Sequence, residues 1–183
     1  MRLFTGVDVP YPMRRNLELL LELLRPTARI SWSPLANLHV TTKFIGEWPR
    51  ERLDELKTAL AAVARPAPLK LGIRGLGWFP NPHSPRVLYV AVQAGPEWET
   101  LARATDAACA ALGIAPETKP FRPHLTLARV REPRPLAELK QAIAALPNDD
   151  FGGWTAGAFH LYESKLAPGG SIYTKLETYS FPQ

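Results

Sequence analysis

The apolar positions of the chain follow two different periods. Four segments place apolar side chains three or four residues apart, as on one face of an α-helix, with proline or glycine near their ends. Between them lie shorter runs with the composition of strands. We expect the helices at 12–25, 49–64, 97–112 and 135–146. We expect the strands at 2–9, 38–46, 69–77, 86–93, 122–130, 154–165 and 171–181, with hairpin loops at 81–85 and 168–170.

These elements occur twice in the same order, as helix, strand, helix and hairpin. The helix starts are separated by 97 − 12 = 85 and 135 − 49 = 86 residues, and the hairpin strands by 154 − 69 = 85 and 171 − 86 = 85. This constant offset indicates an internal repeat, roughly 12–94 and 97–181.

Strands that follow one another through hairpins, with helices inserted, favour an α+β fold with largely antiparallel sheets. We therefore expect a single bilobal domain over residues 1–183. Each half would make one sheet backed by two helices. The two sheets would face a central cleft across a pseudo-two-fold axis, with the helices on the outside.

The strand between the paired helices carries a His-x-Thr motif in each half, at His39 and Thr41 and again at His124 and Thr126. Residues two apart on a strand point to the same face of a sheet. Each half therefore directs one imidazole and one hydroxyl group toward the expected cleft, and the two-fold relation sets the imidazoles opposite each other.

Two imidazoles on either side of one space suit an in-line displacement at phosphorus. A neutral imidazole removes a proton from the attacking oxygen, and an imidazolium protonates the leaving oxygen. The ordinary histidine pKa near 6.5 makes both states accessible near neutrality. Each threonine can donate a hydrogen bond to a nonbridging phosphate oxygen. This chemistry requires no metal or cofactor, and the nearest acidic residues, Glu47 and Glu132, lie outside the motifs.

The motifs extend to Asn-Leu-His-Val-Thr-Thr-Lys-Phe-Ile-Gly at 37–46 and Phe-Arg-Pro-His-Leu-Thr-Leu-Ala-Arg at 121–129. With these strings the chain resembles, over essentially its whole length, the 2H phosphoesterase superfamily with its LigT-like fold. More closely, it is similar to the bacterial and archaeal 2′-5′ RNA ligases, also called RNA 2′,3′-cyclic phosphodiesterases. Thr42 stands where that family often has leucine, and its parity places it away from the cleft.

The resemblance implies an activity and the roles of its residues. A member of this family opens a terminal 2′,3′-cyclic phosphate of RNA to a 2′-phosphate without a metal, and reversible 2′-5′ ligation is an accessory activity. The resemblance further implies that His39 is the proton donor and His124 the proton acceptor.

The family also places a phosphate-binding arginine at Arg129. Its odd offset from His124 requires a bulge or strand end near Ala128, and the alternative is a solvated arginine. Lys43, four residues after His39, has the parity of the cleft. It can contact phosphate or lie on the rim as a general attractant for the RNA backbone. Arg122 is a further candidate for substrate binding.

Three aromatic residues are candidates for stacking on a terminal base: Phe44, Trp78 and Phe79. Packing in the core is the alternative, and it is favoured for Phe44.

Charge and composition restrict the class of binding partner and the cellular location that we expect. The net charge is +5, and residues 1–94 hold 13 basic and 7 acidic side chains, which favours a polyanionic partner. The single Cys109 excludes a disulfide-rich scaffold. No segment approaches the roughly 20 apolar residues of a membrane span. We expect a cytoplasmic monomer with no obligate protein partner, acting on RNA ends with a 2′,3′-cyclic phosphate, such as tRNA halves, or on nucleotides.

Two other functions stay open. One is a 2H phosphoesterase for a small nucleotide-derived cyclic phosphate, which would have a small, closed recess. The other is a non-catalytic module that binds RNA or a nucleotide. The intact histidines and threonines of both motifs argue against the second, and the basic first half favours a longer polyanion over the first.

Overall fold

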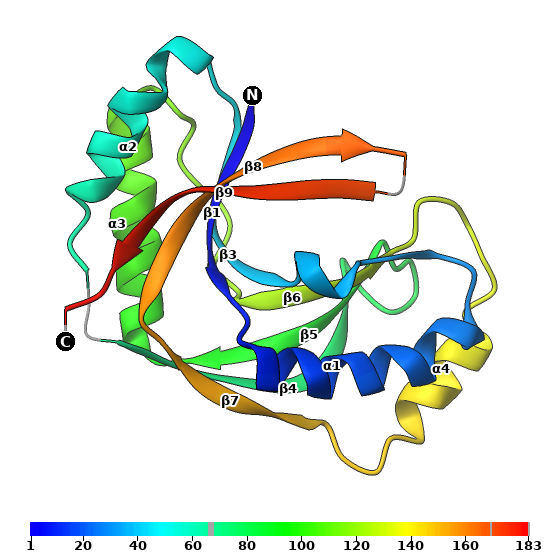
Figure 1. Ribbon diagram of the computed structural model, residues 1–183. Helices are drawn as coiled ribbons and strands as arrows, with labels where there is room; N and C mark the ends of the chain where they lie inside the picture. Colours follow the sequence, from blue (N-terminus) through cyan, green and yellow to red (C-terminus); the bar gives the residue numbers. More distant parts are fainter. Residues whose placement is uncertain (66–67, 169, 183) are drawn as a thin grey trace.

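The computed structural model of the protein describes residues 1–65, 68–168 and 170–182 (Figure 1). The helices are α1 (Tyr11–Leu24), α2 (Leu53–Ala61), α3 (Pro96–Ala111) and α4 (Ala137–Ala144). The strands are β1 (Arg2–Asp8), β2 (Ser31–Trp32), β3 (His39–Glu47), β4 (Leu69–Phe79), β5 (Val87–Ala94), β6 (His124–Arg129), β7 (Asp150–Ala156), β8 (Ala158–Ala167) and β9 (Gly170–Ser180).

The four predicted helices are present, and two are shorter than expected. The segment after Pro49 first forms a 3-10 turn at Arg50–Arg52 and becomes α-helical only at Leu53. The helix α1 follows the expected pattern, with Pro12 in its first turn and Leu17 and Leu21 fully buried. No helix in the described residues is long and apolar enough to cross a membrane.

The strands form two antiparallel sheets, as predicted. Sheet A has the order β3-β1-β8-β9, and sheet B has the order β2-β6-β5-β4-β7. The helices α2 and α3 pack against each other and cover sheet A, whereas α1 and α4 pack together beside β7 of sheet B (Figure 1). The architecture is therefore α+β, with a pair of helices outside each sheet.

The prediction that each half of the chain builds one sheet is wrong. Sheet A combines β1 and β3 with the C-terminal hairpin β8–β9, and sheet B combines the hairpin β4–β5 with β6 and β7. The single strand expected at 154–165 is in fact β7 and β8, which belong to different sheets and are separated at Gly157. An apolar run shows that a strand forms, but the partner of that strand is decided by long-range contacts. Within the predicted loop at 168–170, Gly169 lies outside the described residues.

An extra residue interrupts each strand that carries a His-x-Thr motif soon after its histidine, and β3 has a further register shift at Ile45. Between β1 and β3 the register shifts so that Thr42 has no partner residue, and between β5 and β6 it shifts so that Leu127 has none. Each is a β-bulge, and each lies three residues after its histidine. A bulge reverses the alternation of faces, so the fifth residue after each histidine returns to the histidine side of the sheet.

The bulge overturns the prediction that Lys43 faces the cleft. Lys43 is only 4% exposed and lies on the helix side of sheet A. Its Nζ is 2.6 Å from Oδ1 of Asp106 on α3, and it donates a hydrogen bond of 2.7 Å to the carbonyl of Ala115. Lys43 therefore ties α3 to the back of β3.

Thr42 faces away from the histidine side, as its parity predicted. It is buried and shares a 2.6 Å hydrogen bond with the hydroxyl of Thr5 on β1. The hydroxyl pair satisfies two buried polar groups at a position where leucine would need no partner.

Replacing Lys43 with methionine is expected to lower the free energy of unfolding by about 3–5 kcal/mol, the usual cost of removing one member of a buried ion pair. The charge of Asp106 would lose its partner. The double variant Lys43→Met with Asp106→Leu removes both charges and is expected to recover much of the loss. Urea unfolding of both variants measures the effect. A raised KM with unchanged stability in the single variant would instead place this amine on the substrate side.

Candidate active site

His39 and His124 each begin a strand, and the two strands, β3 and β6, lie side by side between the two pairs of helices (Figure 1). The Nδ1 atom of His39 is 2.7 Å from the carbonyl oxygen of Asn37, and Nδ1 of His124 is 2.7 Å from that of Arg122. A carbonyl oxygen only accepts hydrogen bonds, so Nδ1 carries the hydrogen in both rings. Each ring therefore has Nε2 as the nitrogen that can gain or lose a proton.

Aromatic rings hold both imidazoles in place. Phe4 lies against His39 with a centroid distance of 4.5 Å, and Tyr173 meets it edge-on at 5.2 Å. Phe79 and Tyr89 pack against His124 at 5.0 and 5.6 Å. Such packing limits rotation of the rings, which adds to the effect of the backbone hydrogen bonds.

The threonines of the two His-x-Thr motifs lie on the same sheet faces as their histidines. Thr41 and Thr126 are half-buried and follow the alternation of their strands. Beyond the bulge, Arg129 and Phe44 return to the same faces, and both side chains are exposed. The bulge that Arg129 required next to Ala128 is thus confirmed.

Phe44 is 60% exposed, so the expectation of core packing for this residue is wrong. The two other aromatic candidates, Phe79 and Trp78, lie in different surroundings. Phe79 lies beside His124, whereas Trp78 is paired with Leu88 and packs against the core. The side chain of Arg122 is exposed, and its carbonyl orients His124.

Burial and positive charge act on both imidazoles in the same direction. Burial lowers the pKa of His39, and the charges of His124 and Arg129 lower it further, against the opposing effects of the Asn37 carbonyl and Asp8. Burial also lowers the pKa of His124, with a further contribution from Arg129. The contact between β3 and β6 accounts for the influence of Arg129 on both rings and of His124 on His39.

Among the described residues, a carboxylate lies near only one of the two histidines. Asp8 is the register partner of His39 across β1 and β3. Its Oδ2 is 2.6 Å from Nζ of Lys175 and 3.4 Å from Nε2 of His160, and its Oδ1 accepts a hydrogen bond from the hydroxyl of Tyr162. Burial alone would raise the pKa of Asp8, but the hydrogen bonds from Lys175 and Tyr162 and the charge of His160 outweigh it, and the pKa is lowered. Asp8 is therefore ionised at neutral pH.

Sequence reasoning missed the residues around His39 that come from other strands. Asp8, Phe4, Tyr162 and Lys175 reach the site from β1, β8 and β9. The only signal in the sequence was Asp8, a carboxylate at the end of a mostly apolar strand. The strand order β3-β1-β8-β9 makes the other three residues neighbours of His39, and no local pattern specifies that order.

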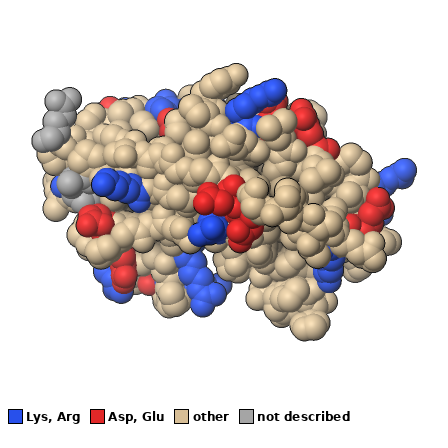
Figure 2. Space-filling model, turned by 90° about the horizontal axis from the view of Figure 1, so that it is seen from below, with Lys and Arg blue, Asp and Glu red and all other residues tan. Residues whose placement is uncertain are grey.

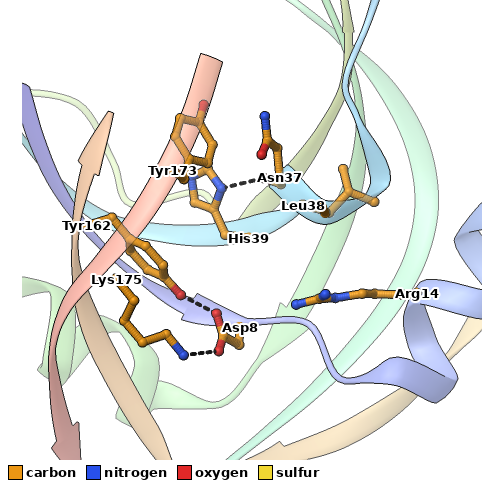
Figure 3. Close-up of a pocket in the computed structure, with 9 residues that line it drawn as sticks. Asp8, Arg14, Asn37, Leu38, His39, Tyr162, Tyr173 and Lys175 are labelled. Carbon is orange, nitrogen blue, oxygen red and sulfur yellow. Dashed lines mark hydrogen bonds and ion pairs between the residues drawn. The ribbon is translucent and has the colours of Figure 1, made fainter. Parts of the chain in front are cut away.

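Asp8, Tyr162 and Lys175 line a cavity of about 200 Å³ beside His39, which we call the His39 pocket (Figure 3). In Figure 3, Arg14 extends from α1 toward Asp8, on the side of the pocket opposite Tyr162 and Lys175. The pocket is lined by Asp8, Arg14, Ala36, Asn37, Leu38, His39, Tyr162, Tyr173 and Lys175.

Charged residues on the outer surface do not mark a binding site as the His39 pocket does. Figure 2 shows the face that lies below in Figure 1, where Lys and Arg are scattered among Asp and Glu and most of the surface carries neither. The basic side chains do not gather into one patch on this face. Among residues 1–65, 68–168 and 170–182, no three His, Cys, Asp or Glu side chains form a group that could hold a metal ion.

The two sheets, the outer helices and the paired His-x-Thr strands are the architecture of a LigT-like 2H phosphoesterase. The model of the 2′-5′ RNA ligase superfamily matches residues 16–167, and the chain belongs to this superfamily. It is 33% identical over 179 residues to the RNA 2′,3′-cyclic phosphodiesterase of Archaeoglobus fulgidus, covering 98% of this chain and 99% of the relative. It is 31% identical over 180 residues to the protein of that name from Methanothermobacter thermautotrophicus, covering 97% of each.

Solved structures agree with this assignment. The crystal structure of TT0787 of Thermus thermophilus superimposes with a TM-score of 0.82 at 34% identity, covering 99% of this chain and 98% of that one. Escherichia coli LigT complexed with 3′-AMP gives a TM-score of 0.76 at 26% identity, covering 100% of this chain and 98% of that one. The predicted LigT-like fold is therefore confirmed.

An NMR titration of the imidazole resonances is expected to place the pKa of both His39 and His124 below the ordinary value of 6.5. Arg129→Gln removes a positive charge near both rings, so it is expected to raise both pKa values. Arg131→Gln removes a charge two residues further along and serves as the control. A pKa above 6.5 for either ring in the unliganded protein, or no response to Arg129→Gln, would contradict the electrostatics described above.

Proposed function

We propose that the protein is a metal-independent RNA 2′,3′-cyclic phosphodiesterase that opens a terminal cyclic phosphate to a 2′-phosphate. The observation that carries the proposal is the pair of imidazoles on the adjacent strands β3 and β6, each with Nδ1 bound to a carbonyl and Nε2 left for proton transfer. The relatives named RNA 2′,3′-cyclic phosphodiesterase support the choice of substrate.

The reaction needs one base and one acid. Nε2 of His124 takes a proton from water as the water oxygen bonds to phosphorus. The bond from phosphorus to O3′ breaks, and His39 gives its Nε2 proton to O3′, which leaves the phosphate on O2′. Thr41 and Thr126 donate hydrogen bonds to the nonbridging oxygens, and the guanidinium of Arg129 stabilises the charge that develops on them. A 5′-hydroxyl in place of water forms a 2′-5′ linkage by the same proton transfers.

The surroundings of the two imidazoles support the assignment of acid and base. The carboxylate of Asp8 favours the positively charged form of His39. The residue that pairs with His124 as Asp8 pairs with His39 is Ala91 on β5, which has no charge. His39 therefore has the environment of a proton donor, and His124 that of an acceptor.

Exposed residues on the sheet faces that carry His39 and His124 bind the terminal nucleoside. Phe44 offers an aromatic face to the base, and Arg129 and Arg122 offer positive charge to the phosphate. Lys43 takes no part, because it is buried behind the sheet with Asp106. We propose RNA ends such as tRNA halves in the cytoplasm as the substrates.

Incubation of the protein with an RNA that ends in a 2′,3′-cyclic phosphate, in the presence of EDTA, is expected to yield a 2′-phosphate. His39→Ala and His124→Ala are each expected to lower kcat by about 10²–10⁴, the usual contribution of general acid–base catalysis. His83→Ala, in an exposed loop, is the matched control. Persistence of the cyclic end, or activity that returns only when metal is added, would reject the mechanism.

The pH dependence of kcat/KM is expected to be bell-shaped with both limbs below pH 6.5. The rate rises as His124 loses its proton and falls as His39 loses its own, and the pKa of each free imidazole lies below 6.5. Activity should therefore decline between pH 6.5 and pH 8. Because Arg129→Gln raises both pKa values, it should move the bell toward higher pH. A wild-type maximum above pH 7 would contradict this account.

A further inference from the structure

A second, larger cavity of about 460 Å³ adjoins the His39 pocket. The two cavities have Asp8 and Arg14 in common, so these residues stand at the junction. The second cavity lies between the start of α1 and the crossing from β7 to β8, and its wall includes Tyr11, Trp154 and His160. Tyr11, in the wall of the second cavity, is 78% exposed, so this cavity reaches the surface.

Arg14 offers free hydrogen-bond donors at this junction. Its Nε donates a 2.7 Å hydrogen bond to the carbonyl of Val9, which fixes the direction of the guanidinium. Within the part of the chain that the structure describes, its two terminal nitrogens make no hydrogen bond or ion pair. The nearby carboxylate of Asp8 is taken by Lys175 and Tyr162 (Figure 3). Among the described side chains here, Asp8 is the carboxylate and Lys175 and Arg14 are the cations. Asp8 pairs with Lys175, so the guanidinium of Arg14 has no carboxylate partner among these side chains.

The position of Arg14 along the site suggests what the guanidinium binds. On β3, His39 is the first residue and Phe44 the sixth, and their partners on β1 are Asp8 and Phe4 respectively. Arg14 therefore lies at the His39 end of the site, away from Phe44. A terminal nucleoside with its base at Phe44 and its cyclic phosphate at the histidines can extend its 5′ chain toward Arg14.

We propose that Arg14 binds the phosphodiester that precedes the terminal nucleoside, and that the cavity beyond it receives the preceding nucleoside. This inference rests on the proposed function and adds the residue by which the site distinguishes an RNA strand from a mononucleotide. A guanidinium with two free nitrogens matches the paired nonbridging oxygens of a phosphodiester. Arg14 thereby acts as a specificity residue, because a nucleoside 2′,3′-cyclic phosphate has nothing to place there.

The test compares two substrates, adenosine 2′,3′-cyclic phosphate and the dinucleotide ApA with a terminal 2′,3′-cyclic phosphate. The quantity measured is the ratio of their kcat/KM values. The wild-type protein is expected to favour the dinucleotide by roughly 10- to 100-fold, the effect of a charge-assisted hydrogen bond. Arg14→Gln is expected to remove most of this preference. Arg15→Gln removes a charge one residue further along, on an exposed side chain paired with Glu18, and should keep it.

A third substrate removes the charge from the ligand instead. ApA with a neutral methylphosphonate linkage and a terminal 2′,3′-cyclic phosphate should lose the preference with wild-type protein, and Arg14→Gln should then add no further loss. An unchanged ratio in Arg14→Gln, an equal loss in Arg15→Gln, or indifference to the charge of the linkage would each overturn the assignment.

The same experiments distinguish a failure of the proposed function from a failure of the role proposed for Arg14. If the wild-type protein hydrolyses neither the mononucleotide nor the dinucleotide, the proposed reaction is wrong. The role of Arg14 is then decided by dissociation constants for ApA 2′-phosphate with the phosphodiester or the methylphosphonate linkage. Tighter binding of the charged ligand that depends on Arg14 supports the site, and equal binding of the two ligands overturns it.

Discussion

The hydrogen bond from Nδ1 of each imidazole to the carbonyl two residues before it is the interaction on which the site depends. It commits one nitrogen of each ring to the backbone, so the other nitrogen is the only one that can exchange a proton with a substrate. The carbonyls of Asn37 and Arg122 are 122 − 37 = 85 residues apart, the same offset as the two histidines. The same local geometry therefore occurs at the start of both strands.

The two rings share this geometry but not their electrostatic surroundings. His39 has the carboxylate of Asp8, held by Tyr162 and Lys175, whereas the corresponding position beside His124 carries Ala91. Proton transfer in one direction requires such a difference, because two identical imidazoles would have no preferred donor. The cavity at Arg14 also lies on the His39 side. In the proposed reaction, catalytic direction and substrate entry are thus both determined by what surrounds His39.

Each histidine strand shares its sheet with a hairpin that the repeat had assigned to the other half of the chain. The C-terminal hairpin pairs with β1 beside β3, and the central hairpin pairs with β6. Each histidine strand is therefore in a sheet built from distant parts of the chain, and the separation of the rings depends on the whole fold rather than on one loop. Equivalent bulges at Thr42 and Leu127 agree with a duplicated origin, which stays a prediction.

The sequence by itself determined the helices, most strands, the α+β class and the two His-x-Thr pairs, because these depend on local periodicity and on residue identity. Only the tertiary structure decided that Lys43 turns to the back of the sheet and Phe44 to the front, because a bulge depends on the register with a neighbouring strand. It also decided that Asp8, Tyr162, Lys175 and Arg14 surround one histidine. Strand pairing joins residues more than a hundred positions apart, and no pattern within a single segment encodes that choice.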